Sequence, residues 1–117
     1  MHELSIAESL IKIISDEMRK HGLHKLHSVQ IVYGQISAIV PEALETAFEV
    51  LTHGTELAGA QIGMTVKPMV VQCQQCGREF SPDRKAHLAM PCPDCGAAHG
   101  HSIVSGRELY IDHIEAE

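Results

Sequence analysis

Apolar residues recur along the start of the chain with the period of a helix. The members of this stripe are Leu4, Ala7, Leu10, Ile11, Ile14 and Met18. Spacings of three and four residues place them on one face of an α-helix, which we expect to pack against a core. The segment from Ser5 to Glu8 matches a capping box, so we predict that Ser5 is the N-cap and that residues 1–4 precede the helix. Gly22 suits its C-terminal end.

A strand and a second helix are predicted next. In the strand, Val29, Ile31 and Tyr33 alternate with Gln30 and Val32, and we expect it to end near Gly34. Pro41 suits the first turn of the helix. The buried stripe of this helix is predicted to contain Leu44, Ala47, Phe48 and Leu51, and Gly54 is expected to end it.

Two further strands complete the predicted sheet. Apolar residues alternate at Ile62, Met64 and Val66, and we expect this strand to extend toward Val70 and Val71. Near the end of the chain, we predict a third strand with Leu109 and Ile111 on one face and Tyr110 and Ile114 on the other. The pattern therefore predicts an α+β fold with two helices packed on a small three-stranded sheet.

Composition limits the classes of function. The chain has 117 residues, which suits one ordinary domain or a small domain with a metal-stabilised module. Its 9 Lys and Arg against 15 Asp and Glu disfavour nucleic-acid binding, because cationic excess is what displaces phosphate counterions. No apolar stretch is long enough to span a membrane, and the first residues do not resemble a secretory signal. We therefore predict a cytoplasmic protein with a metal or protein partner.

Between the last two strands lies a segment of different composition. From Cys73 to about His101 the chain is rich in Cys, Pro, Gly and His and has few large aliphatic residues. Such a segment buries too little apolar surface to fold alone. We therefore expect it to be an inserted domain that something other than a hydrophobic core stabilises.

Four cysteines supply that stabilisation in our interpretation. Cys73 and Cys76 form one C-x2-C pair, Cys92 and Cys95 form a second, and fifteen residues separate the pairs. This spacing is typical of zinc sites, and four thiolates complete a tetrahedral, structural site with no open position. The alternatives are two disulfides, four unrelated thiols or an iron centre of the rubredoxin type. A reducing compartment disfavours the disulfides, and the spacing disfavours unrelated thiols.

The first residues, MHELS, contain a second candidate metal site. The α-amine of Met1, the amide nitrogen of His2 and its imidazole can close fused chelate rings on one ion, and Glu3 can add an amide or carboxylate donor. Nitrogen-rich planar sets favour Ni(II) or Cu(II) over zinc. Binding should weaken as the pH falls, because protons compete for these nitrogens. The alternative is that His2 is an exposed bystander.

The order of motifs along the whole chain resembles the HypA/HybF family of nickel metallochaperones for [NiFe]-hydrogenase maturation. These motifs are MHELS, IVYGQIS, VPEALETAFEVLTHGTELAGA, the two C-x2-C pairs and SGRELYI. The resemblance implies a nickel-binding α/β domain of residues 1–72 plus 102–117 and a zinc domain of residues 73–101. It implies that His2 is the essential nickel ligand, with the Met1 amine, backbone amides and Glu3 as co-donors. The matching zinc ligands are Cys73, Cys76, Cys92 and Cys95.

Two positions depart from some relatives, which carry a histidine directly after each cysteine pair. Here Gly77 and Gly96 stand at those positions. The nearest substitutes, His99 and His101, could form a secondary metal pair, but we expect them to be exposed loop residues. Three other histidines, His21, His24 and His27, surround the predicted end of the first helix, where an imidazolium is favourable, and we do not assign them as ligands.

The function predicted from these features is that of a carrier without catalytic residues. By its resemblance, the protein takes Ni(II) from the GTPase HypB and passes it to the hydrogenase large subunit, with urease as a further recipient in some relatives. One alternative is a zinc-ribbon adaptor for nucleic acid or protein, which the net charge of −6 disfavours for nucleic acid. Another is an iron electron carrier. The sequence is compatible with a monomer or a homodimer.

Overall fold

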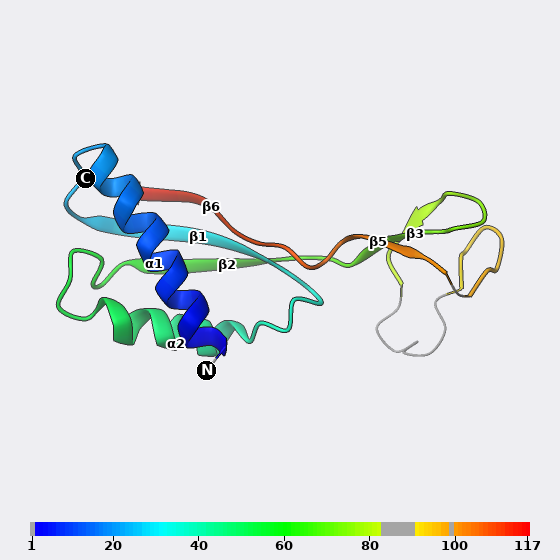
Figure 1. Ribbon diagram of the computed structural model, residues 1–117, viewed down its shortest axis with the longest axis horizontal. Coiled ribbons are helices and arrows are strands. Elements are labelled where there is room, and N and C mark those ends of the chain that lie inside the picture. The colour runs from blue at the N-terminus through cyan, green and yellow to red at the C-terminus, as the bar shows by residue number, and fades with distance from the viewer. Residues whose placement is uncertain (1, 83–90, 99) are drawn as a thin grey trace. The chain divides into compact units, whose positions relative to one another are not determined.

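The chain folds as two compact units in the computed structural model, which describes residues 2–82, 91–98 and 100–117, without the side chain of His2 (Figure 1). One unit, here called the helical unit, comprises Met1–Val32, Ala38–Thr65 and Leu109–Glu117. The other, the cysteine unit, comprises Tyr33–Ser37 and Val66–Glu108. The cysteine unit is thus longer than the inserted segment 73–101 defined from the sequence, because strands on both sides of that segment belong to it.

Helix α1 spans His2–Lys20, so the predicted N-cap at Ser5 is wrong. Ser5 lies inside the helix, where its carbonyl accepts a bond from the Ser9 hydroxyl at 3.2 Å. The S-x-x-E pattern also fits the interior of an amphipathic helix, and Glu3 is favourable near the positive end of the helix dipole. Beyond Lys20 the chain turns at Gly22, which has φ +67° as predicted for a helix end.

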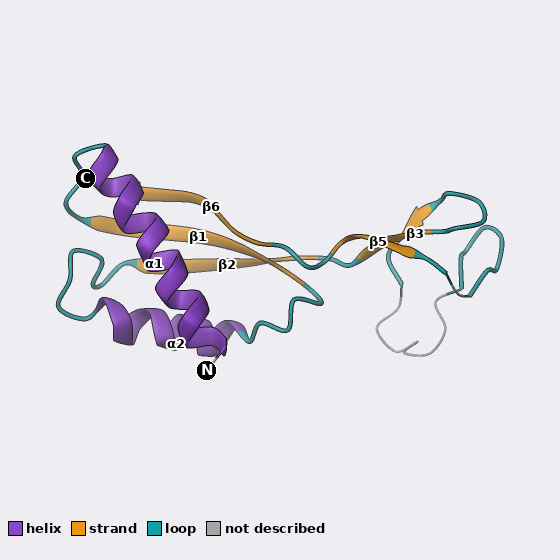
Figure 2. Cartoon of the chain, in the orientation of Figure 1, coloured by secondary structure: helices purple, strands orange, loops and turns teal. Residues whose placement is uncertain are grey.

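The core of the helical unit forms where both helices meet strand β1, Leu26–Gly34. Helix α2 spans Pro41–Thr52, with proline in its first turn as predicted. The fully buried residues of this core are Ala7, Leu10, Ile14, Met18, Leu26, Val29, Ile31, Leu44, Phe48 and Leu57. The two helices lie beside the strands in Figure 2. Neither described helix is long and apolar enough to cross a membrane.

The sheet of the helical unit has the order β2-β1-β6, with β2 at Gln61–Lys67 and β6 at Leu109–Ala116. This confirms the predicted fold class of two helices with a small sheet. The predicted faces of β6 are wrong in one respect, since Ile114 packs against the same core as Leu109 and Ile111. Two consecutive exposed residues, Asp112 and His113, shift the alternation by one position, which turns Ile114 inward.

The second predicted strand is in fact two strands of different sheets. Strand β2 ends at Lys67, and β3 covers only Val70–Gln72. Pro68 lacks an amide hydrogen for a continued ladder, and the amide of Met69 donates instead to Gln35 Oε1 at 2.8 Å. Apolar alternation alone did not reveal this break.

A short second sheet of order β4-β3-β5 forms the framework of the cysteine unit. Strand β3 pairs antiparallel with β4, Glu79–Phe80, and with β5, Ser102–Ser105. Its central residue, Val71, is fully buried opposite Phe80 and Ile103. The β3–β4 hairpin encloses the first cysteine pair, and β5 follows closely after the second pair, so the sheet brings the two pairs together.

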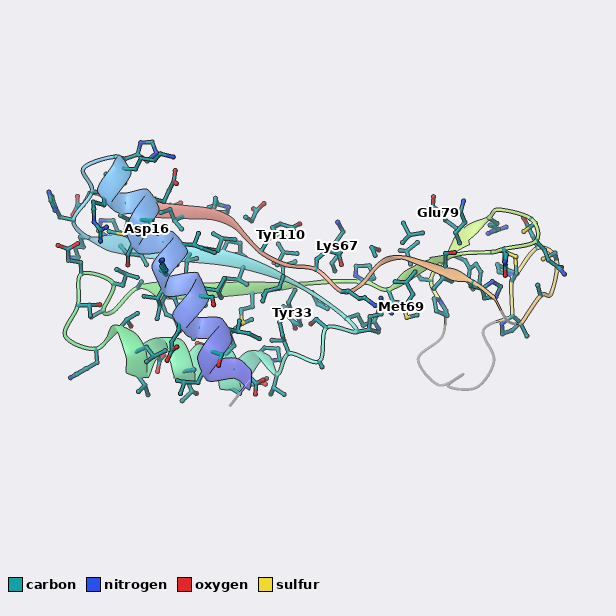
Figure 3. The ribbon with its side chains drawn as sticks, viewed as in Figure 1. Asp16, Tyr33, Lys67, Met69, Glu79 and Tyr110 are labelled. Atoms are coloured by element: carbon teal, nitrogen blue, oxygen red, sulfur yellow. The ribbon has the colours of Figure 1, made fainter. Side chains whose placement is uncertain are left out.

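Three segments of the cysteine unit meet around Gly34. The Gly34 amide donates to the Glu108 carbonyl at 2.7 Å, and the Ile36 amide donates to the Gly106 carbonyl at 2.8 Å. A Cβ at Gly34 would overlap the Gly106 carbonyl group, so only glycine permits this approach. Figure 3 labels Lys67 and Met69 in the same region.

We expect Gly34→Ala to lower the free energy of unfolding by about 2–3 kcal/mol, because the new methyl group meets backbone that cannot move aside. Urea unfolding followed by circular dichroism measures this. Gly63→Ala is the matched control, since the nearest atoms to its Cβ belong to the end of the Gln30 side chain, which can move aside at the cost of one exposed hydrogen bond to Thr65. Equal losses in the two variants would contradict the close-packing argument.

Glu108 should make stability depend on acidic pH. The Gly106 amide donates to its carboxylate at 2.6 Å, and Lys67 lies 3.6 Å away. Hydrogen bonds from the amides of Gly106 and of Glu108 itself, followed by the Lys67 charge, hold the pKa of Glu108 below its ordinary 4.5. This stabilisation is complete above pH 4.5 and is lost as the pH falls through the lowered pKa.

In Glu108→Gln we therefore expect a loss of about 1 kcal/mol at pH 7 that shrinks as the pH is lowered. Urea midpoints between pH 3 and pH 7 measure this difference. A loss that stays constant over this range would show that the charge of Glu108 is not involved.

Candidate metal centre

Each cysteine pair lies in a tight turn with the same backbone geometry. The Gly77 amide donates to the Cys73 carbonyl at 2.9 Å, and the Gly96 amide donates to the Cys92 carbonyl at the same distance. Both glycines have φ +77°, which explains why glycine follows each pair. Below, we call residues 73–78 and 92–97 the first and second knuckles.

The two knuckles bring all four sulfur atoms to one point. Cys73 Sγ lies 3.5 Å from Cys95 Sγ, and Cys76 Sγ lies 3.5 Å from Cys92 Sγ. All four atoms lie within 4.8 Å of one another, and none of the cysteines forms a disulfide. Among the described residues, this is the one group of His, Cys, Asp or Glu side chains that is arranged to hold a metal ion. The disulfide alternative is therefore wrong for this structure.

Backbone amides and neighbouring sulfurs lower the pKa of two of the four thiols and raise the pKa of the other two. Hydrogen bonding from the Cys76 amide lowers the pKa of Cys73 to about 6, and the Cys95 amide lowers that of Cys92. At Cys76 the Arg78 amide also lowers the pKa, but the Cys92 sulfur and burial outweigh it and raise the value to about 12. The Cys95 pKa is raised in the same way. Four thiolates this close repel one another, so full ionisation requires a cation at their centre.

The donor set fits a tetrahedral metal ion. With metal–sulfur bonds of about 2.3 Å, sulfurs at the corners of a tetrahedron lie about 3.8 Å apart. Two of the observed separations are 3.5 Å and none exceeds 4.8 Å, so the four sulfurs lie close to this spacing. Four protein ligands leave no open coordination position, so the arrangement can hold an ion but offers no place for a substrate.

The N-terminal candidate residues are only partly described. Met1 and the side chain of His2 lie outside the described residues, and Glu3 is half-buried in the first turn of α1. The structure therefore does not test the predicted ligand set of Met1, His2 and Glu3. It does place the backbone amides of His2 and Glu3 at the start of a helix, where amides have no partner four residues earlier.

None of the other described histidines belongs to the four-cysteine group. His21 lies 3.0 Å from the carboxylate of Glu17. His24 lies 4.0 Å from that of Glu56, and His27 lies 3.2 Å from that of Glu117. His99 lies outside the described residues. The prediction that His101 is an exposed loop residue is wrong, since it is half-buried and meets the Phe80 ring edge-on at 5.2 Å. His101 Nε2 lies 2.9 Å from the Ala97 carbonyl oxygen.

Sequence reasoning missed two residues beside the metal centre. Arg78 Nη1 donates to Asp94 Oδ1 at 2.7 Å and joins the first knuckle to the second. Asp94 lies between the cysteines of the second pair, and Arg78 follows the glycine of the first. The sequence did show opposite charges in the two turns, which could have suggested an ion pair. The pairing became evident only in the structure, where the turns face each other.

Comparison with known proteins gives a consistent result. The model of the family described as "Hydrogenase/urease nickel incorporation, metallochaperone, hypA" matches residues 1–116. A hydrogenase maturation factor HypA from Solidesulfovibrio magneticus is 52% identical over 117 residues, with full coverage of both chains. The factor of the same name from Lawsonia intracellularis is 37% identical over 118 residues, again with full coverage.

Two solved structures share the fold. The solution structure of a HypA protein aligns over 100% of this chain and 97% of its own, with a TM-score of 0.75 and 24% identity. The solution structure of the Ni metallochaperone HypA from Helicobacter pylori aligns over 97% and 96%, with a TM-score of 0.66 and 22% identity. At these identities the structures support the fold alone.

Removal of the metal should unfold the cysteine unit and leave the helical unit intact. Val71, Cys73 and Cys92 are the buried hydrophobic residues among the described part of the cysteine unit, whereas the helical unit has its own aliphatic core. We expect chelator treatment to abolish amide protection in β3 and β5 and to preserve it in α1 and α2. Hydrogen–deuterium exchange measures this, with re-addition of zinc as the control. Retained protection in β3 would refute the dependence on metal.

Proposed function

The chain belongs to the HypA family of metallochaperones for nickel incorporation into hydrogenase and urease, and from this premise we propose that it binds one Ni(II) ion at its N-terminus. His2 is the principal ligand, through its imidazole and its amide nitrogen. The Met1 amine and Glu3 supply further donors. The delivered ion is the cargo of the protein, and no catalytic residue is required.

The start of α1 supports this proposal. The first amides of a helix have no acceptor four residues earlier, so no intrahelical hydrogen bond has to break before the amides of His2 and Glu3 lose their protons and bind an ion.

A terminal site suits delivery rather than storage. A carrier must release its ion, and donors at the end of a helix can separate from the ion without disturbing the core that begins at Ala7. A planar set of nitrogen donors suits Ni(II) better than a softer site built from thiolates does. The proposed nickel site and the four-cysteine site therefore use different donor atoms and come from different parts of the sequence.

The four cysteines hold a structural Zn(II) ion in this proposal. Cys73, Cys76, Cys92 and Cys95 provide four sulfur donors at the spacing that tetrahedral zinc requires. Zinc has no redox chemistry of its own and would supply only cohesion between the knuckles. Iron at this position is the competing occupant, and metal analysis of the purified protein distinguishes the two.

The proposed partners follow from the resemblance to the HypA family. We assign the GTPase HypB as the source of nickel and the hydrogenase large subunit as its recipient, in the cytoplasm, where thiols remain reduced. A protein partner accords with the net charge of −6, which disfavours nucleic acid.

Nickel titration by calorimetry at pH 7.5 tests the site. We expect zinc-loaded protein to bind one Ni(II) ion, and His2→Ala or one added N-terminal residue to weaken binding at least 100-fold, because each disrupts the chelate rings. His24→Ala is the matched control and should bind like wild type, since His24 faces only Glu56. Equal binding by all variants would exclude the N-terminal site.

Binding should also weaken steeply below neutral pH. The amine and the imidazole must both lose a proton to bind, and their ordinary pKa values are about 7.7 and about 6.5. We expect the apparent affinity to fall at least tenfold between pH 7.5 and pH 6.0. A pH-independent affinity would indicate a carboxylate site instead.

A further inference from the structure

The two knuckles of the metal centre are related by an approximate twofold symmetry. Equivalent residues of the two turns make equivalent bonds: the Cys73 amide donates to the Arg78 carbonyl at 2.8 Å, and the Cys92 amide donates to the Ala97 carbonyl at 2.9 Å. The first cysteine of each pair is buried and the second is exposed. By backbone and burial alone, the exposed Cys76 and Cys95 would be equivalent ligands.

Side chains break this symmetry on the Cys76 side. The Arg78 amide donates to Cys76 Sγ, and the Asp94 amide donates to Cys92 Sγ. The side chains of Arg78 and Asp94 are joined at 2.7 Å, and the two sulfurs lie 3.5 Å apart. These four residues therefore form a closed ring that crosses from one knuckle to the other.

The Cys95 side lacks such a ring. Symmetry places Gln75 at the position of Asp94 and Ala97 at the position of Arg78. Their amides donate to Cys73 Sγ and Cys95 Sγ as expected. Ala97 cannot form an ion pair, however, and Gln75 makes only a long hydrogen bond, in which its Oε1 accepts from Cys95 Sγ at 3.9 Å. The cross-knuckle contact between Cys73 and Cys95 is therefore held by no charged pair at these two positions.

We infer that Cys95 is the most labile of the four metal ligands and that the Arg78–Asp94 ion pair holds the Cys76 side closed. This inference rests on the four-cysteine zinc site of the proposed function. An incoming reagent reaches Cys76 and Cys95 from solvent, whereas Cys73 and Cys92 are 2% and 3% exposed. Of the two accessible sulfurs, only Cys76 lies in the ring that the Arg78–Asp94 ion pair closes.

Cysteine alkylation of zinc-loaded protein tests the order of release. The protein is incubated with N-ethylmaleimide, sampled over time and mapped by peptide mass spectrometry, while a chromogenic chelator records zinc loss. We expect Cys95 to be labelled first, about two- to fivefold faster than Cys76, because an exposed ion pair has a modest effect. Cys73 and Cys92 should be labelled only with or after zinc loss.

Two variants separate positioning from a general effect on folding. Asp94→Asn keeps the amide that donates to Cys92 and removes the charge, so Cys76 should be labelled as fast as Cys95. Gln75→Asp with Ala97→Arg installs the symmetry-related ion pair, so labelling of Cys95 should slow to the rate of Cys76. Asp112→Asn, which removes an exposed carboxylate next to His113 in the helical unit, is the control and should leave all rates unchanged.

Zinc content, measured first, distinguishes the possible failures. Protein without one bound zinc ion overturns the proposed metal site itself. Protein that holds one zinc ion but shows Cys76 labelled first, or equal rates at Cys76 and Cys95, overturns the inference and leaves the site intact. An Asp94→Asn variant that exposes all four cysteines together would show that the pair supports the fold as a whole, which also overturns the inference.

Discussion

The convergence of four sulfur atoms is the constraint on which the cysteine unit depends. Its described strands are short, and Val71 is the one aliphatic residue among them that is fully buried. Hydrophobic burial of this extent cannot offset the conformational entropy of ordering the unit. Mutual repulsion of the thiolates opposes closure until a cation is present, so the metal provides both cohesion and charge balance.

The helical unit is stabilised in a different way. Two amphipathic helices and strand β1 supply an aliphatic core with Phe48 as its one fully buried aromatic residue among those described. Such a core is independent of metal, and it supports the start of α1 without enclosing it. This difference suits a carrier, since a structural ion must be retained while a transported ion must leave. The two kinds of site accordingly use different donors: sulfur in the knuckles, nitrogen at the proposed terminal site.

Close approach of backbone segments determines where strands of the two sheets begin and end. Gly34 tolerates the carbonyl of Gly106 against its Cα, and Gln35 occupies the amide of Met69, which a continued strand would have used. Pro68 removes a further donor at the same point. These local features redirect the chain between β2 and β3, although its apolar alternation continues across the break.

The sequence alone determined the helices, the strands of the first sheet, the grouping of Cys73, Cys76, Cys92 and Cys95 as a candidate metal site, and the family. Periodicity and cysteine spacing are local, so they are readable without a structure. Tertiary structure decided the start of α1, the inward turn of Ile114 and the separation of β3 from β2. It also brought Arg78 to Asp94 across the two knuckles. These features depend on which distant segments meet, and pairing of that kind leaves no periodic signal along the chain.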